Sequence, residues 1–95
     1  MAWTIDYTQS ARNQLEKLDK PVAKRILDFM DNRVAKHDEP RALGKSLTGS
    51  LGTLWRYRIG DYRIVCEIQH SALRILVIRI GHRSEVYRRS SHAHW

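Results

Sequence analysis

The sequence has few of the residues that define several other classes of protein. Cys66 is the single cysteine among 95 residues, so no disulfide can form within the chain. It falls on the apolar side of an alternating run, which predicts a buried and unreactive thiol. No apolar stretch approaches the roughly 20 residues that a membrane-spanning helix needs, and the N-terminus lacks the layout of a signal peptide. We therefore expect a cytoplasmic protein with no membrane partner.

Common acid–base, phosphate-binding and metal motifs are also missing. No Glu–His or paired-histidine arrangement suited to general acid–base catalysis is evident. The segment Lys45-Ser46-Leu47-Thr48-Gly49-Ser50 has the wrong glycine and lysine spacing for a P-loop. His92 and His94 have no cysteine or carboxylate beside them, so they do not form a recognisable metal site. The sequence predicts no metal and no cofactor.

Positive charge is what the sequence has in excess. The chain contains seventeen lysines and arginines and ten acidic residues, which gives a formal net charge of +7. Twelve of the seventeen basic residues are arginine. Such an excess on a small domain indicates a polyanionic partner, either nucleic acid or an acidic protein. The guanidinium group suits bidentate contacts to phosphate, which favours nucleic acid. A basic surface that serves only solubility is the alternative.

The first half of the chain predicts one strand and two helices. Residues 3–7 alternate as a short strand, and Thr8 or Ser10 can cap the helix that follows. Asp19 and Pro21 mark the start of a second helix that extends to about Lys36. Its apolar stripe is expected to pack in the core and consists of Val22, Ile26, Phe29, Met30 and Val34. Residues 41–52, which include three glycines, are interpreted as a loop that brings basic residues to the rim of an arginine-bearing face of the predicted sheet.

The second half predicts three strands. Residues 54–59 place Trp55, Tyr57 and Ile59 on one face and Arg56 and Arg58 on the other. Gly60-Asp61 is a hairpin turn, residues 62–69 alternate again, and residues 73–80 form an apolar central strand. The fold class is α+β, a single domain over residues 1–95 in the order β-α-α-β-β-β. An antiparallel sheet should pack against the N-terminal α-hairpin, with residues 88–95 as a flexible basic tail.

Together these motifs resemble a known family. The hairpin Trp55–Val65 and the ending Gly81-His82-Arg83-Ser84-Glu85-Val86-Tyr87 are similar to the RelE branch of the RelE/ParE toxin superfamily. The resemblance implies a type II toxin, an mRNA interferase that cuts messenger RNA in the ribosomal A site and inhibits translation. It also implies that the 2′-hydroxyl attacks the adjacent phosphate, and that a cognate acidic antitoxin silences the enzyme. The expected partners are therefore the antitoxin, the ribosome with its rRNA, and mRNA.

The resemblance also implies a set of site residues. The family's catalytic positions fall on Arg56, Arg58, Arg63, Arg83 and Tyr87. The arginines would stabilise the charge that develops on the phosphate, and Tyr87 would remove the 2′-hydroxyl proton. RNA or ribosome contacts are expected from Arg41, Lys45, Arg88 and Arg89.

His82 is a further possible acid–base group. Neighbouring strand residues point to opposite faces, so only one of His82 and Arg83 should face the site. The best-known member of the branch has lysines where this chain has Arg56 and Arg58. Two other functions stay open at this point: a ParE-like poison of DNA gyrase with the same fold, and an inactive RNA-binding homologue.

Overall fold

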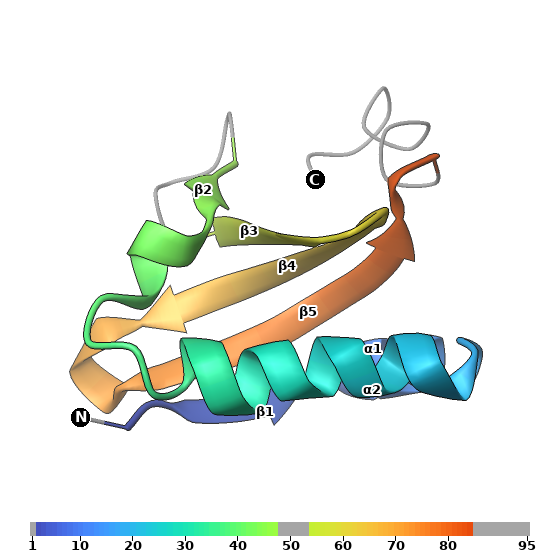
Figure 1. Cartoon of the computed structure of the whole chain (residues 1–95). Helices are drawn as coiled ribbons and strands as arrows, with labels where there is room; N and C mark the ends of the chain where they lie inside the picture. Colours follow the sequence, from blue (N-terminus) through green and yellow to red (C-terminus); the bar gives the residue numbers. More distant parts are fainter. Residues whose placement is uncertain (1, 48–53, 85–95) are drawn as a thin grey trace.

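The sheet of this protein has five strands and is covered on one face by helices (Figure 1). A computed structural model describes residues 2–47 and 54–84. The helices are α1 (Gln9–Glu16) and α2 (Lys20–Asp28), and α2 continues into a π-helical turn (Phe29–Val34). The strands are β1 (Thr4–Tyr7), β2 (Lys45–Ser46), β3 (Leu54–Ile59), β4 (Tyr62–Gln69) and β5 (Arg74–His82). Short 3₁₀ turns span Pro40–Leu43 and His70–Ala72.

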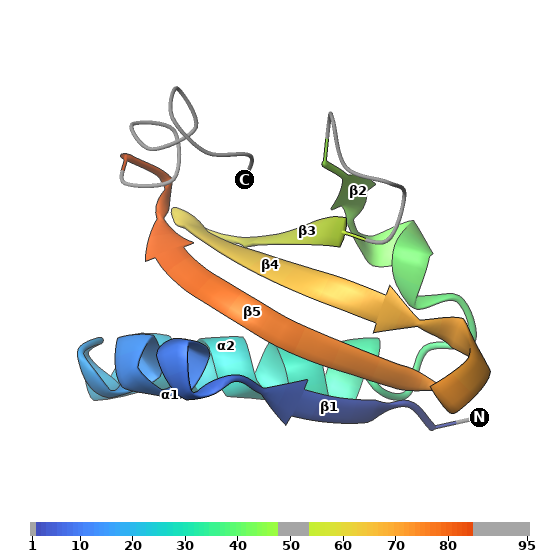
Figure 2. The ribbon, with the colours of Figure 1, turned by 180° about the vertical axis from the view of Figure 1, so that it is seen from behind.

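The strand order is β1-β5-β4-β3-β2, with β1 beside β5 at one edge and β2 beside β3 at the other (Figure 2). This confirms an α+β fold in which an N-terminal α-hairpin packs on a sheet. The prediction of an antiparallel sheet is wrong in one respect, because β1 pairs with β5 in parallel. The two strands are far apart in sequence, and the long connection through the helices and the β3–β4 hairpin allows this orientation.

Three boundaries differ from the sequence-based prediction. The loop predicted over residues 41–52 contains β2, whose Lys45 pairs with Arg56 of β3. The strand predicted over residues 73–80 begins at Arg74, because Leu73 belongs to the turn after β4 and adopts a left-handed conformation with φ of 48°. This strand also extends beyond residue 80, since Gly81 and His82 lie within β5 and Gly81 pairs with Arg63. The Gly60-Asp61 hairpin turn is confirmed, and Gly60 has the positive φ of 57° that glycine tolerates.

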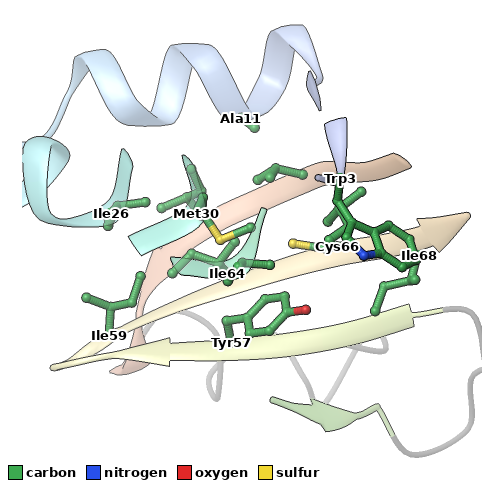
Figure 3. Packing of buried hydrophobic residues seen from close by; sticks show 13 residues of the cluster. Trp3, Ala11, Ile26, Met30, Tyr57, Ile59, Ile64, Cys66 and Ile68 are labelled. Atoms are coloured by element: carbon green, nitrogen blue, oxygen red, sulfur yellow. The ribbon is translucent and has the colours of Figure 1, made fainter. Parts of the chain in front are cut away.

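The helices begin where the sequence indicates and bury the predicted stripe. The Thr8 hydroxyl accepts a hydrogen bond from the Ala11 N–H at 3.1 Å and caps α1. Ile26, Met30 and Val34 of the second helix are completely buried against the sheet. Figure 3 shows Ile26 and Met30 above Tyr57 and Ile59 of β3 and Ile64 of β4, which belong to the same core cluster. The predicted core face of the second helix is confirmed.

The central strands supply the other half of the core. Tyr57, Ile64 and Cys66 are completely buried, as expected for the apolar face of the hairpin. The predicted burial of Cys66 is confirmed, and this burial raises the pKa of its thiol and keeps the thiol protonated. Trp55 shares this face and is half-buried at the edge of the cluster.

The part of β5 that has no neighbouring strand on the β1 side forms hydrogen bonds with side chains of Thr8 and α1. β1 pairs with β5 only as far as Val77, so residues 78–82 extend beyond the end of β1. The Thr8 hydroxyl donates to the Ile78 carbonyl at 3.1 Å, and the Gln14 Oε1 accepts from the Ile80 N–H at 2.7 Å. These two side chains satisfy backbone groups that a neighbouring strand would otherwise bind.

The described part of the chain lacks a membrane-spanning helix and a cluster of metal ligands. No helix in residues 2–47 and 54–84 is long and apolar enough to cross a membrane. No group of three or more histidine, cysteine, aspartate or glutamate side chains in these residues is placed to hold a metal ion. The predicted basic tail, with His92 and His94, lies outside the described residues.

Candidate active site

A row of basic residues lies on the sheet face that the helices leave uncovered. Residues directly opposite each other in an antiparallel pair have their side chains on the same face. Lys45 of β2 pairs with Arg56 of β3, and Arg58 of β3 pairs with Arg63 of β4. Because Tyr57, between the two β3 arginines, points into the core, Arg56 and Arg58 point away from it. The predicted arginine face therefore exists, and β2 extends it by one lysine.

Three of these cations surround a cavity. The cavity has a volume of about 250 Å³ and lies between β3 and the segment that leads into β2. Its lining consists of Ala42, Leu43, Gly44, Lys45, Arg56 and Arg58. Lys45 and Arg58 are exposed and Arg56 is half-buried, so the positive groups are accessible to a dissolved anion. Three converging cations around a small cavity form a site suited to a phosphate group.

Gly44 allows the wall of this cavity to lie close to β3. A Cβ atom at this position would be 2.5 Å from the Arg56 carbonyl oxygen and 2.9 Å from ring carbons of Trp55 and Tyr57. A Cβ atom does not make contacts this short, so only glycine fits here without a shift of the neighbouring backbone. The close approach keeps Lys45 beside Arg56.

Two hydrogen bonds hold the 3₁₀ turn Pro40–Leu43 on β3. The Tyr57 hydroxyl donates to the Pro40 carbonyl at 2.8 Å, and the Trp55 Nε1 donates to the Arg41 carbonyl at 3.1 Å. The Arg41 guanidinium lies over the Trp55 ring, 5.4 Å from its centroid. Arg41, which the sequence predicts as an RNA contact, is thus half-buried beside the cavity with its side chain on Trp55.

Arg63 lies in a different environment from the other arginines of the face. Its side chain is only 4% exposed. Its Nη1 donates to the carbonyls of Gly60 at 3.0 Å and Tyr62 at 3.1 Å, both in or next to the hairpin turn. The structure therefore brings Arg63 to the predicted face but uses its guanidinium to hold the turn.

His82 is the last residue of β5, and Arg83 follows it. His82 pairs with Tyr62, which lies opposite Ile59 of the core, so the imidazole is on the face away from Arg56 and Arg58. Arg83 follows the end of β5, its side chain is exposed, and its N–H donates to the Asp61 carbonyl at 2.6 Å. Only one of His82 and Arg83 is expected to face the site, and in this register His82 is the one that faces away from it. Tyr87, Arg88 and Arg89 lie outside the described residues.

Sequence reasoning missed Arg79 as a member of this face. Simple alternation along β5 would place Arg79 with Ile75 and Val77, which are buried in the core. A β-bulge shifts the register, so that Val65 pairs with Arg79 while Cys66 pairs with Val77. After the bulge Ile80 points into the core and Arg79 joins the basic face. An arginine at a core position of an apolar strand is the one sequence feature that could have indicated the bulge.

The sequence and the fold match known toxins. A family model described as the ParE toxin of the type II toxin-antitoxin system parDE matches residues 5–87. Toxin RelG of Mycobacterium tuberculosis is 29% identical over 89 residues, covering 94% of this chain and all of that protein. Toxin RelE of the same organism is 33% identical over 84 residues, covering 88% of this chain and 84% of that protein.

Solved structures show the same fold. The toxin–antitoxin complex RelBE2 of M. tuberculosis contains a chain that superposes with a TM-score of 0.79 at 26% identity, covering 88% of this chain and 94% of that one. The isolated RelE toxin of E. coli superposes with a TM-score of 0.69 at 21% identity, covering 95% of this chain and 96% of that one. The fold and the family match define a toxin of a type II toxin–antitoxin system. The chain belongs to the ParE toxin family, within the RelE/ParE superfamily, and is RelE-like.

Proposed function

We propose that this toxin is a ribosome-dependent endoribonuclease that cleaves mRNA in the ribosomal A site and thereby inhibits translation in the cytoplasm. The observation that carries the proposal is the cavity of about 250 Å³ lined by Lys45, Arg56 and Arg58. Its cations come from two neighbouring strands in direct register, so their geometry is set by the sheet. The likeness to toxins named RelE and RelG supports an RNA substrate.

The proposed reaction is an internal displacement at phosphorus. The 2′-oxygen attacks the adjacent phosphate and the bond from phosphorus to the 5′-oxygen breaks, which leaves a 2′,3′-cyclic phosphate and a free 5′-hydroxyl. Arg56 and Arg58 bind the non-bridging oxygens, where negative charge increases in the transition state. Tyr87, as its phenolate, accepts the 2′-hydroxyl proton, and Arg83 stabilises or protonates the departing 5′-oxygen. Arg63 holds the hairpin turn that connects Arg58 to β4, and it adds positive potential.

The proposed partners follow from the remaining charges. Arg41, Lys45, Arg88 and Arg89 bind rRNA or mRNA phosphates, and the ribosome orients the message because the toxin has few acid–base groups of its own. Solved structures with the same fold include the toxin–antitoxin complex RelBE2 and a RelB-RelE antitoxin–toxin complex. By analogy, a cognate acidic antitoxin covers the basic face of this toxin and blocks access of RNA.

The decisive experiment compares cleavage of one mRNA on programmed ribosomes and in free solution. The wild-type protein should cut the ribosome-bound message at the A site and leave the free RNA nearly intact. Arg58→Gln, Arg83→Ala and Tyr87→Phe should each lower the single-turnover rate by roughly 10²-fold or more. All three variants should still bind the antitoxin, which shows that they are folded. Equal cleavage of both RNAs, or none by the wild type, would refute the proposal.

A second candidate function is poisoning of DNA gyrase. The family model that matches this chain is named for ParE, and this is the observation in its favour. Gyrase supercoiling assays separate the two functions, because a gyrase poison would inhibit supercoiling and spare the mRNA. The nuclease proposal predicts normal supercoiling at toxin concentrations that abolish translation.

A further inference from the structure

The last residue of β5 and the first residue of β4 form an aromatic pair. His82 and Tyr62 are directly opposite in the sheet register, and their rings meet edge to face with centroids 5.4 Å apart at 88°. Both side chains are half-buried. The contact with Tyr62 and the strand pairing fix the orientation of the imidazole ring.

The same ring accepts a hydrogen bond from the chain that follows it. The Ser84 N–H donates to the His82 Nδ1 at 3.2 Å, and the Ser84 Oγ lies 2.9 Å from the same nitrogen. The Ser84 N–H can donate to Nδ1 only where this nitrogen carries a lone pair, so this hydrogen bond requires the tautomer with its proton on Nε2. His82 therefore uses Nδ1 to hold the backbone two residues further on.

Arg83 lies between two peptide groups that are both held in place. Its own N–H donates to the Asp61 carbonyl of the hairpin turn at 2.6 Å. The next N–H, that of Ser84, is bonded to the His82 ring. Since peptide groups are planar, fixing the groups on either side restricts φ and ψ of Arg83. The direction in which the exposed Arg83 side chain leaves the backbone is thereby set.

We propose that His82 is a positioning residue that orients Arg83 toward the reacting phosphate through the Ser84 N–H. This inference rests on the proposed nuclease function, in which Arg83 acts at the departing oxygen. His82 lies on the face away from Arg56 and Arg58, so it acts through Arg83 and not on the RNA. Misplacing a catalytic group by about 1 Å can reduce a rate by roughly 10²-fold.

Two variants separate the functions of the ring. His82→Phe keeps an aromatic contact with Tyr62 and removes the acceptor. His82→Asn removes the ring and offers a side-chain oxygen that can accept the Ser84 N–H, as asparagine does at helix starts. Single-turnover cleavage on programmed ribosomes should fall by roughly 10- to 10²-fold in His82→Phe and stay within about threefold of wild type in His82→Asn. Ribosome binding should be nearly equal in both.

A double-variant cycle tests whether the effect passes through Arg83. In an Arg83→Ala background, adding His82→Phe should cause no further loss, because the group that it positions is gone. A full additional loss would overturn the inference, as would wild-type activity in His82→Phe or a loss confined to His82→Asn. Nitrogen NMR of the imidazole gives a readout that needs no activity: a proton on Nδ1 would overturn the inference. Absence of cleavage by the wild-type protein would instead refute the proposed function.

Discussion

Arg58 lies directly opposite Arg63 across the β3–β4 hairpin. Two cations at such a position repel each other. The structure separates their environments, because Arg63 is buried and donates to the Gly60 and Tyr62 carbonyls while Arg58 stays exposed. One arginine of the pair therefore stabilises the turn, and the other is available to an anion.

Because Arg63 is buried and Arg58 is exposed, substitutions at the two positions should affect stability differently. Arg63→Met keeps most of the apolar stem and removes both hydrogen bonds to the turn. It should lower the free energy of unfolding by about 2–3 kcal/mol, since hydrogen bonds from charged donors are among the stronger ones. The matched variant Arg58→Met should change it by no more than about 0.5 kcal/mol, as for other exposed positions. Urea unfolding measures both, and equal losses would contradict the assignment.

Gly44 and Gly60 should respond differently to alanine. Gly44→Ala places a Cβ atom 2.5 Å from the Arg56 carbonyl oxygen, so the 3₁₀ turn must move off β3. We expect a loss of about 2–3 kcal/mol from overpacking, together with weaker RNA binding. At Gly60 an added Cβ would meet only the Arg25 guanidinium, at an ordinary contact distance of 3.5 Å, but the backbone keeps a φ of 57°. Gly60→Ala should therefore lose about 1 kcal/mol without changing the cavity. A loss in Gly44→Ala no larger than that in Gly60→Ala would contradict the close approach at Gly44.

Binding to ribosomes should depend on salt through the cavity cations. Each phosphate contact contributes about 0.7–0.9 to the slope of log K against log salt concentration. Arg58→Gln should reduce the slope by about that amount. Arg33→Gln is the matched control, because it removes the same charge from the helical side, where Arg33 lies 5.7 Å from the Phe29 ring centroid. A titration over several salt concentrations decides, and identical slopes for the two variants would argue against phosphate binding at Arg58.

Alkaline pH should destabilise the fold through Cys66. Burial raises the pKa of its thiol above that of the unfolded chain, so the folded protein retains this proton to higher pH. The resulting stabilisation is complete below about pH 8.5 and is lost as the pH rises further. Burial also raises the pKa of Tyr57, which extends the decline above about pH 10. Urea unfolding across this range should show the decrease, and Cys66→Ala should flatten its first part. A stability that is independent of pH in wild type would contradict the burial of a protonated thiol.

Local patterns were sufficient to predict the helices and the hairpin. Gly60-Asp61 predicted its turn because few dipeptides allow the backbone of a two-residue hairpin. Ile26, Met30 and Val34 predicted a buried helix face because their spacing is helical. The parallel pairing of β1 with β5 could not be predicted in this way, because alternation shows which face is buried but not which strand lies beside it.

The candidate site was also predicted only in part, because strand alternation shows which face a side chain is on but not what lies beside it. Strand parity placed Arg56 and Arg58 together and turned His82 away from them. Parity could not show that Arg63 is buried and donates to the Gly60 and Tyr62 carbonyls, since burial depends on which groups pack over that face of the sheet. It could not show that Lys45 joins the pair, because the two-residue strand β2 is too short to have a period. The bulge that moves Arg79 to the basic face also lies outside any two-residue alternation.

The side chains of Thr8 and Gln14 close part of an exposed strand edge. An unpaired strand edge is a template on which another chain can add a strand, the usual first step of edge-to-edge aggregation. Thr8 and Gln14 occupy the Ile78 carbonyl and the Ile80 N–H, two of the groups that an incoming strand would need. The same Thr8 hydroxyl also caps α1, so one side chain both starts the helix and occupies a backbone group of this edge. The segment that begins the N-terminal hairpin therefore also makes part of β5 unavailable to an added strand.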